Sequence, residues 1–182
     1  MTVGLASIAQ RAGDPVAVVT PGSGVRIAPT TRRDVVTVIA QALQSVRPAW
    51  SEPLAPALAR VAPASRVVIV SDLLGDEAPL RRAAMRHAVQ GGEVIVVHVL
   101  SRQEVTLDPL LSLVHDPERP ADIRWVDAGS VRAYTDALNA WLHQTSAAWV
   151  ELGATYVRVV AEEEPAASVR SVIEAVQRAR AG

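Results

Sequence analysis

The sequence contains no cysteine and no lysine, so all 18 of its basic residues are arginine. Without cysteine the chain has no disulfides, no thiolate nucleophile and no cysteine-based metal site. Without lysine it has neither Schiff-base chemistry nor the lysine of a phosphate-binding loop. These absences remove several classes of enzyme from consideration.

Strong charge and long apolar runs are also absent. A net charge of −1 provides no electrostatic attraction for nucleic acid or for an anionic membrane. No apolar run approaches the roughly 20 residues that a membrane-spanning helix requires, and residues 1–11 lack the basic start of a secretion signal. We therefore expect no nucleic-acid partner, no direct membrane insertion by this chain, and a cytoplasmic location.

The most informative stretch runs from Ser65 to Asp76. Four consecutive branched aliphatic residues, Val67 to Val70, lead directly into a polar turn. A run this short and continuous predicts a fully buried strand near the centre of a parallel sheet. Because ligands of open α/β sheets bind beyond the carboxyl ends of such strands, Ser71 and Asp72 are placed where a functional site is expected.

The rest of the chain alternates between helical and strand patterns. With 182 residues, 49% of them hydrophobic, we expect a single domain over residues 1–182. Its fold class is α/β, with a mostly parallel sheet, an antiparallel edge strand and an inserted hairpin near 108–127. The predicted strands are 16–20, 25–27, 67–70, 93–100 and 155–160; the predicted helices are 2–11, 31–46 (with Thr30 or Thr31 as N-cap), 53–61, 77–90, 130–152 and 166–179.

Oxygen-bearing side chains follow the ends of these elements. Ser51, Asp72 and Asp76 offer the hydroxyl and carboxylate oxygens that a hard divalent cation prefers. A structural interpretation stands beside this one: Ser51 caps the helix that starts near Pro53, while Ser71 or Asp72 holds a turn. The residues alone leave both interpretations open.

The histidines and the glycine turn give weaker signals. His98 lies within an aliphatic strand and is expected to be buried and hydrogen-bonded rather than a ligand. His115 and Asp116 resemble a base with its orienting carboxylate, but no serine elbow accompanies them. The turn from Gly22 to Gly24 precedes a strand pattern rather than a helix, which favours a plain hairpin over a phosphate-binding loop. The aromatic residues Tyr134, Trp141 and Trp149 recur at helical spacing and predict core packing.

Four segments follow one another along the chain: Asp14–Thr20, Arg47–Leu54, Val67–Leu74 and Gly92–Leu100. The hairpin near 108–127, the Tyr134-containing helix and the Gly153–Tyr156 entry to the last strand continue this order. Together these segments resemble a bacterial family called domain of unknown function 58. Its members carry a von Willebrand factor A-like domain.

The resemblance implies a Rossmann-like, three-layer α/β/α sandwich with a metal-ion-dependent adhesion site. That site normally has an Asp-x-Ser-x-Ser loop after the first strand, a threonine from a second loop and an aspartate from a third. Asp72 matches the third part, and Ser51 is the nearest match to the second. The sequence has no Asp-x-Ser-x-Ser. The metal site is therefore expected to be incomplete, with magnesium bound only if the missing strand is supplied.

In this family the first strand lies between the strands that correspond to 16–20 and 67–70. Three arrangements would account for its absence. The sequence is an N-terminally incomplete piece of a longer protein, or residues 16–20 pair directly with residues 67–70, or another chain supplies the strand. We favour the first or the second, and a longer parent protein would allow membrane tethering.

The leading functional hypothesis is a non-enzymatic protein-interaction module. Its predicted contact residues are Ser51, Ser71, Asp72 and Asp76, and the resemblance suggests AAA+ ATPases as partners. The alternative is a small α/β enzyme or nucleotide-binding domain that uses Asp72 and the Gly22–Gly24 turn.

Overall fold

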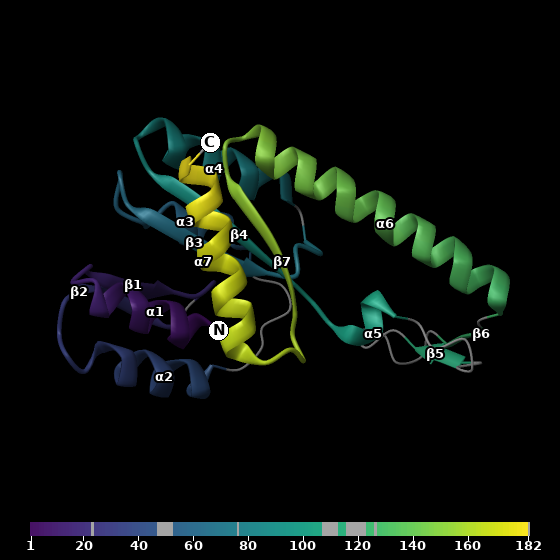
Figure 1. Ribbon diagram of the computed structural model, residues 1–182, viewed down its shortest axis with the longest axis horizontal. Helices are drawn as coiled ribbons and strands as arrows, with labels where there is room; N and C mark the ends of the chain where they lie inside the picture. The colour runs from purple at the N-terminus through teal and green to yellow at the C-terminus, as the bar shows by residue number, and fades with distance from the viewer. Residues whose placement is uncertain are drawn as a thin grey trace.

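The computed structural model describes residues 1–22, 24–46, 53–75, 77–106, 113–115, 123–125 and 127–181. Its elements alternate between helices and strands, as the sequence predicts (Figure 1). In chain order they are α1 (Thr2–Arg11), β1 (Val16–Val19), β2 (Arg26–Thr30), α2 (Val35–Ser45), α3 (Ala55–Leu58), β3 (Arg66–Ser71), α4 (Glu77–Val89), β4 (Glu93–Leu100), α5 (Arg102–Val105), β5 (Leu113–His115), β6 (Ile123–Trp125), α6 (Ala128–Glu151), β7 (Thr155–Val160) and α7 (Pro165–Ala181).

A parallel three-stranded sheet in the order β3-β4-β7 forms the centre of the fold. β4 has the predicted bounds, and Val96, Val97 and His98 on it have no exposed surface. β3 was expected to be the fully buried central strand, and that prediction is wrong for the described residues. It ends the sheet, because no described strand pairs with its outer edge, and Val68 on it is 36% exposed.

Helices cover both faces of this sheet, so the architecture is α/β and consistent with a Rossmann-like fold. The alternation of side chains along the strands divides the core into two clusters. Val94, Val96 and Ile69 pack against α3, α4 and α6, while Ile95 and Val97 pack against α1 and α7. The helical contributors are Leu58, Leu80, Ala83, Ala84 and Trp149 on the first face, and Met1, Leu5, Val172, Ala175 and Val176 on the second.

β1 and β2 form a separate antiparallel pair, with register Val16↔Thr30 and Val19↔Arg26. This confirms the predicted hairpin, although the pair is not the edge of the parallel sheet. The expectation that residues 16–20 pair directly with residues 67–70 is wrong: within the described ranges β1 pairs only with β2, and β3 only with β4. The hairpin has its own small core with α1 and α2, formed by Ala6, Val16, Val35 and Ile39.

The predicted inserted hairpin is present as β5 and β6, which pair antiparallel over Leu113↔Trp125. The predicted helix starts differ from the observed ones by four residues at α2 and by one or two residues at α3, α6 and α7. α2 begins at Val35 after Asp34, because Thr30 still belongs to β2 and its hydroxyl accepts a hydrogen bond from the Arg32 amide (3.2 Å). α3 begins at Ala55 with Leu54 in the N-cap position, and Ser51, the predicted cap, lies outside the described residues.

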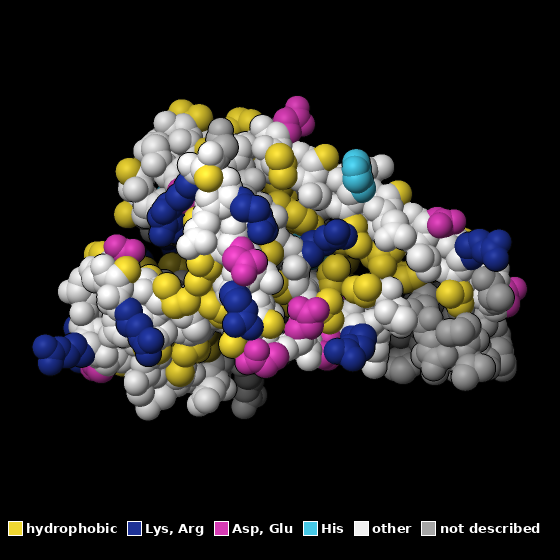
Figure 2. Space-filling view, viewed as in Figure 1, with side chains coloured by type: hydrophobic (Ala, Val, Ile, Leu, Met, Phe, Trp, Pro, Cys, Tyr) yellow, Lys and Arg dark blue, Asp and Glu magenta, His cyan; other side chains and the backbone are white. Residues whose placement is uncertain are grey.

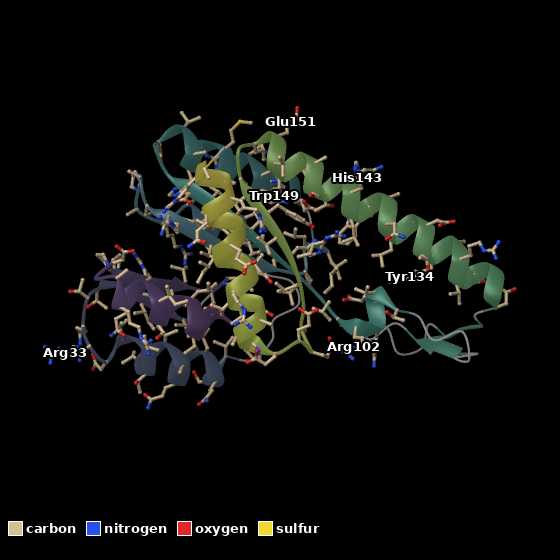
Figure 3. The ribbon with its side chains drawn as sticks, in the orientation of Figure 1. Arg33, Arg102, Tyr134, His143, Trp149 and Glu151 are labelled. Carbon is tan, nitrogen blue, oxygen red and sulfur yellow. The ribbon has the colours of Figure 1, made fainter. Side chains whose placement is uncertain are left out.

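α6 is the longest helix, at 24 residues, and it extends beyond the sheet (Figure 1). Trp149 near its end is fully buried, as predicted. Tyr134 is 38% exposed instead of lying in the core, and its hydroxyl donates to the Glu104 carbonyl (3.0 Å), which connects α6 to α5 (Figure 3). Among the helices that the structure describes, none combines the length and apolar character needed to cross a membrane.

α1 and α7 approach each other closely at Gly4. A Cβ atom placed on Gly4 would lie 2.9 Å from Cγ2 of Val169, a residue only 9% exposed. Valine is stiff at χ1, so it cannot easily turn away. The α1–α7 contact therefore depends on glycine at position 4.

We expect Gly4→Ala to destabilise the protein by about 1–2 kcal/mol, because the overlap with Val169 outweighs the helix propensity that alanine adds. Urea unfolding of Gly4→Ala, Val169→Ala and the double variant measures this effect. In the Val169→Ala background, Gly4→Ala should be neutral or stabilising. Additive effects of the two substitutions would contradict the proposed overlap.

Candidate functional site

The last residue of β3 and the loop after it, residues 71–75, lie at the carboxyl edge of the parallel sheet. Two of its polar side chains bond to the loop's own backbone. The Ser71 hydroxyl accepts from the Leu73 amide (3.1 Å), and Oδ1 of Asp72 accepts from the Leu74 amide (3.3 Å). Such bonds are typical of turns that serine and aspartate stabilise. The turn-holding role predicted for Ser71 and Asp72 is therefore present.

Leu73 is the strained residue of this loop. Its φ of 56° lies in the left-handed region, which costs a branched side chain about 1–2 kcal/mol. The Leu73 side chain is only 3% exposed and packs in the cluster that contains Leu80 and Ala83. Burial of this side chain offsets the strain, and it fixes the path of the residues on either side.

The two neighbours of Leu73 face the opposite way. Asp72 is exposed, and Leu74 is 65% exposed although it is a large apolar residue. One carboxylate and one large apolar side chain are thus exposed on either side of Leu73. This pairing of one charged and one apolar contact is suited to recognising another protein.

His98 lies on β4 beside the start of this loop, because it pairs with Ser71 at the end of β3. The predicted burial and hydrogen bonding of His98 are confirmed: it has no exposed surface, and its Nδ1 lies 2.5 Å from the Tyr156 hydroxyl. Its ring also meets Trp141 edge-on, with ring centroids 5.2 Å apart. Nε2 has no hydrogen-bond partner among the described residues.

Burial controls the ionisation of this pair. It lowers the pKa of His98 below the usual value, and the Asp72 carbonyl and the Glu77 carboxylate only partly oppose that shift. Burial likewise raises the pKa of Tyr156 to about 12. Both groups are therefore neutral at pH 7.

A second polar cluster centres on Glu77, the first residue of α4. Its Oε2 accepts from Nε1 of Trp149 (3.1 Å) and from Arg81 (3.1 Å), and the Glu77 side chain is 11% exposed. The helix N-terminus also favours its negative charge. The Trp149–Glu77 hydrogen bond could not be predicted from the sequence, because Trp149 lies 72 positions from Glu77 and its pattern assigns it only to the core.

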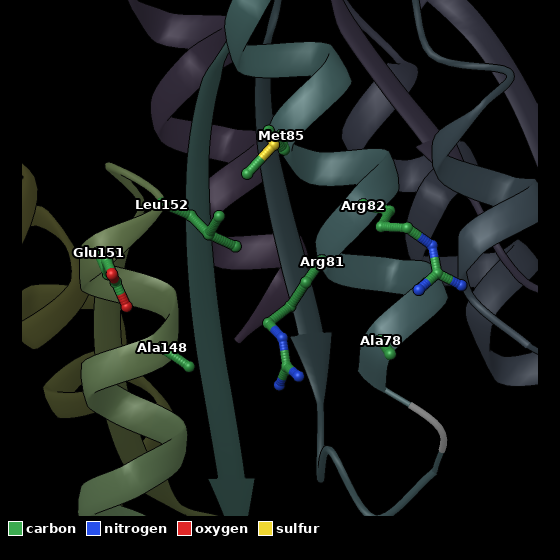
Figure 4. A pocket seen from close by; sticks show the side chains of 7 residues that line it. All are labelled: Ala78, Arg81, Arg82, Met85, Ala148, Glu151 and Leu152. Atoms are coloured by element: carbon green, nitrogen blue, oxygen red, sulfur yellow. The ribbon is translucent and has the colours of Figure 1, made fainter.

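Two shallow grooves lie beside α6. One, of about 310 Å³, runs between α4 and α6, and Figure 4 shows Arg81 and Arg82 on one wall and Glu151 on the other. The second, of about 290 Å³, follows the ends of β4 and β7. The first is lined by Ala78, Arg81, Arg82, Met85, Ala148, Glu151 and Leu152; the second by Leu100, Val105, Thr135, Leu138, Asn139, Leu142, Arg158, Val159, Val160 and Glu163.

Several predicted site residues are not joined to the loop. Ser51, Asp76 and Asp116, together with the side chain of His115, lie outside the described residues. Gly22 and Gly24 lie in the connection between β1 and β2. In the part of the chain that the structure describes, no three histidine, aspartate or glutamate residues are grouped so that they could hold a metal ion.

Comparison with known proteins shows a likeness to a solved structure. No protein-family model matches the chain, and no curated protein matches it. Among solved structures, the chain is similar to a conserved hypothetical protein, BatB from Bacteroides thetaiotaomicron. The TM-score is 0.56 at 14% sequence identity, and the match covers 100% of this chain and 87% of BatB. At this identity the likeness shows a shared fold.

The buried His98 leads to a prediction about pH. Because its pKa is lowered in the folded state, the unfolded chain binds more protons at mildly acidic pH, so stability falls as pH drops below about 6.5. Urea unfolding at pH 7.5 and 5.5 should show this loss, and His98→Gln should reduce it. His143→Gln, at an exposed position on α6, is the control and should leave it unchanged. An equal pH dependence in wild type and His98→Gln would contradict the assignment.

Proposed function

We propose that this chain is a non-enzymatic protein-interaction module of the von Willebrand factor A-like type, which contacts its partner through the loop at residues 71–75. The observation that carries the proposal is the exposed pair Asp72 and Leu74 on either side of the buried, strained Leu73. Strain is retained where the surrounding structure holds a residue in a functional position. An ordered loop also loses little entropy on binding.

The structural likeness to BatB supports the fold part of this proposal. The parallel sheet β3-β4-β7 with helices on both faces and the adjoining β1–β2 pair fit the arrangement that the family resemblance implies. In that arrangement Asp72 occupies the third part of a metal-ion-dependent adhesion site, and Ser51, Ser71 and Asp76 belong to the same contact surface. The resemblance suggests AAA+ ATPases as the first partners to test.

The loop's own chemistry favours recognition over catalysis. Oδ1 of Asp72 already accepts a backbone hydrogen bond; beneath the loop His98 is buried, and its partner Tyr156 is half-buried. The alternative function, a small enzyme or nucleotide-binding domain, would use Asp72 with the Gly22–Gly24 turn. That turn leads into β2 and not into a helix N-terminus, where phosphate groups bind most readily.

We expect Asp72→Ala and Leu74→Ser to weaken partner binding at least about tenfold, because each removes one of the two contacts that the loop presents. Binding of purified candidate AAA+ ATPases to the immobilised chain measures the effect. Asp136→Ala, which removes an exposed carboxylate on α6, is the matched control and should bind like wild type. A rise in melting temperature with ATP or GTP that is lost in Asp72→Ala would instead favour the nucleotide-binding alternative.

We also expect weak or no magnesium binding by this chain. Asp72 and Ser51 supply only part of the oxygen ligands that a magnesium site requires. Isothermal titration calorimetry with magnesium chloride tests this expectation. A micromolar site that Asp72→Asn abolishes would show that the chain completes the metal site with its own residues.

A further inference from the structure

A second surface lies on the outer face of α4, beside the groove that α4 forms with α6. Ala78, Met85 and Val89 recur at helical spacing on this face, opposite the buried residues Leu80 and Ala83. Met85 is 51% exposed and Val89 is 82% exposed, the largest exposed fraction among the large apolar residues that the structure describes. An exposed apolar stripe of this kind is typical of a surface that contacts another protein.

The groove continues this apolar stripe toward α6. Ala78 and Met85 line it from α4, and Ala148 and Leu152 line it from α6 (Figure 4). Figure 2 shows hydrophobic atoms at the surface where the end of α6 adjoins α4. None of residues 71–75 lines the groove, and a strand added beside β3 would extend the sheet in its own plane. The groove is therefore independent of the loop and of whatever pairs with β3.

Arginines flank the apolar stripe on both sides. By the helical period, Arg81 lies on one side of it, and Arg82 and Arg86 lie on the other. Arg81 is paired with Glu77 (3.1 Å). Arg82 and Arg86 are exposed, and neither has an ion-pair partner among the described residues. Glu151 stands on the opposite wall, so α4 presents an apolar stripe beside two unpaired positive charges.

The backbone of the two walls determines what kind of segment fits between them. Amides and carbonyls inside a helix are paired with one another, so α4 and α6 offer no backbone partners to an extended strand. A strand in this groove would give up its hydrogen bonds to water without replacing them. A helix satisfies its own backbone and presents apolar side chains at the same spacing as the stripe.

Neither this chain nor a symmetric second copy supplies a suitable helix. The longest stretch outside the described residues, residues 116–122, is shorter than the stretch from Ala78 to Val89 that a docked helix would follow. A symmetric contact between two copies would place Arg82 and Arg86 against the same residues of the other α4, and like charges repel. The occupant that fits is a partner of opposite charge.

We propose that the outer face of α4, with its groove to α6, binds an acidic amphipathic helix of a partner protein. Apolar side chains of that helix cover Met85 and Val89, and its carboxylates pair with Arg82 and Arg86. This contact does not use the loop at residues 71–75, so either surface can fail without the other.

Binding of synthetic peptides to the full chain tests the proposal. The probe is an amphipathic helix of about 18 residues, with leucine at i, i+3, i+4 and i+7 spacing and glutamate on both flanks. Its counterpart has lysine in place of every glutamate. The glutamate peptide should bind at least about tenfold more tightly, because its charge complements that of α4. It should also shift the amide resonances of Arg82, Met85 and Val89.

A charge exchange assigns the contact to α4. Arg82→Glu combined with Arg86→Glu should reverse the preference, so that the lysine peptide binds more tightly than the glutamate peptide. Arg132→Glu changes an exposed arginine of α6 that does not line the groove. This matched control should retain the preference of wild type.

Substitutions in the apolar stripe test the other half of the contact. Met85→Ser and Val89→Ser should each weaken the glutamate peptide at least about fivefold, because apolar area is lost from the contact. Met85→Leu, which keeps an apolar side chain of similar size, should bind within about twofold of wild type. Asp72→Ala should bind the peptide like wild type, which separates this surface from the loop at residues 71–75.

Several results would overturn the proposal. Equal affinity for the two peptides, or no binding at millimolar peptide, would mean that α4 does not select an acidic helix. Unchanged affinity in both Met85→Ser and Val89→Ser would mean that the peptide lies elsewhere. Self-association in sedimentation experiments that the double arginine variant changes would mean that a second copy of this chain occupies the face. If the double variant does not fold, the resonance shifts of wild type with each peptide decide.

Discussion

The structure depends on the hydrogen-bond ladder that joins β4 to a parallel strand on each side. β4 has almost no exposed surface because β3 and β7 pair with its edges while helices cover its faces. Parallel pairing places the carboxyl ends of β3 and β4 at one edge. The loop after β3 and His98 on β4 therefore lie together, and every feature of the candidate site follows from that register.

The loop at residues 71–75 combines one buried residue with exposed residues on either side of it. Leu73 is buried in the core in a left-handed conformation, while Asp72 and Leu74 on either side face solvent. Beneath them, the His98–Tyr156 pair and the Glu77–Trp149 hydrogen bond connect β4, β7, α4 and α6. These hydrogen bonds stabilise the structure beneath the loop, while the side chains of Asp72 and Leu74 stay exposed.

Much of the fold could be predicted from periodicity. α1 and β4 have the bounds that the sequence predicts, because each has a clear hydrophobic period and a glycine near its end: Gly13 after α1, and Gly91 and Gly92 before β4. The start of α2 could not be predicted, since the polar residues from Thr30 to Asp34 offer several possible caps. β3 was assigned correctly as a strand and wrongly as fully buried.

The sequence by itself determined the order of the elements, the α/β class and the position of Asp72 after a strand, because these depend on local composition and on the direction of the chain. Only the tertiary structure decided that β3 ends its sheet, that Leu73 adopts a positive φ and that Tyr156 reaches His98 from 58 positions away. Burial and pairing are properties of neighbours that are distant in sequence. A local sequence pattern does not specify which strand pairs with the edge of a sheet, or whether that edge stays unpaired.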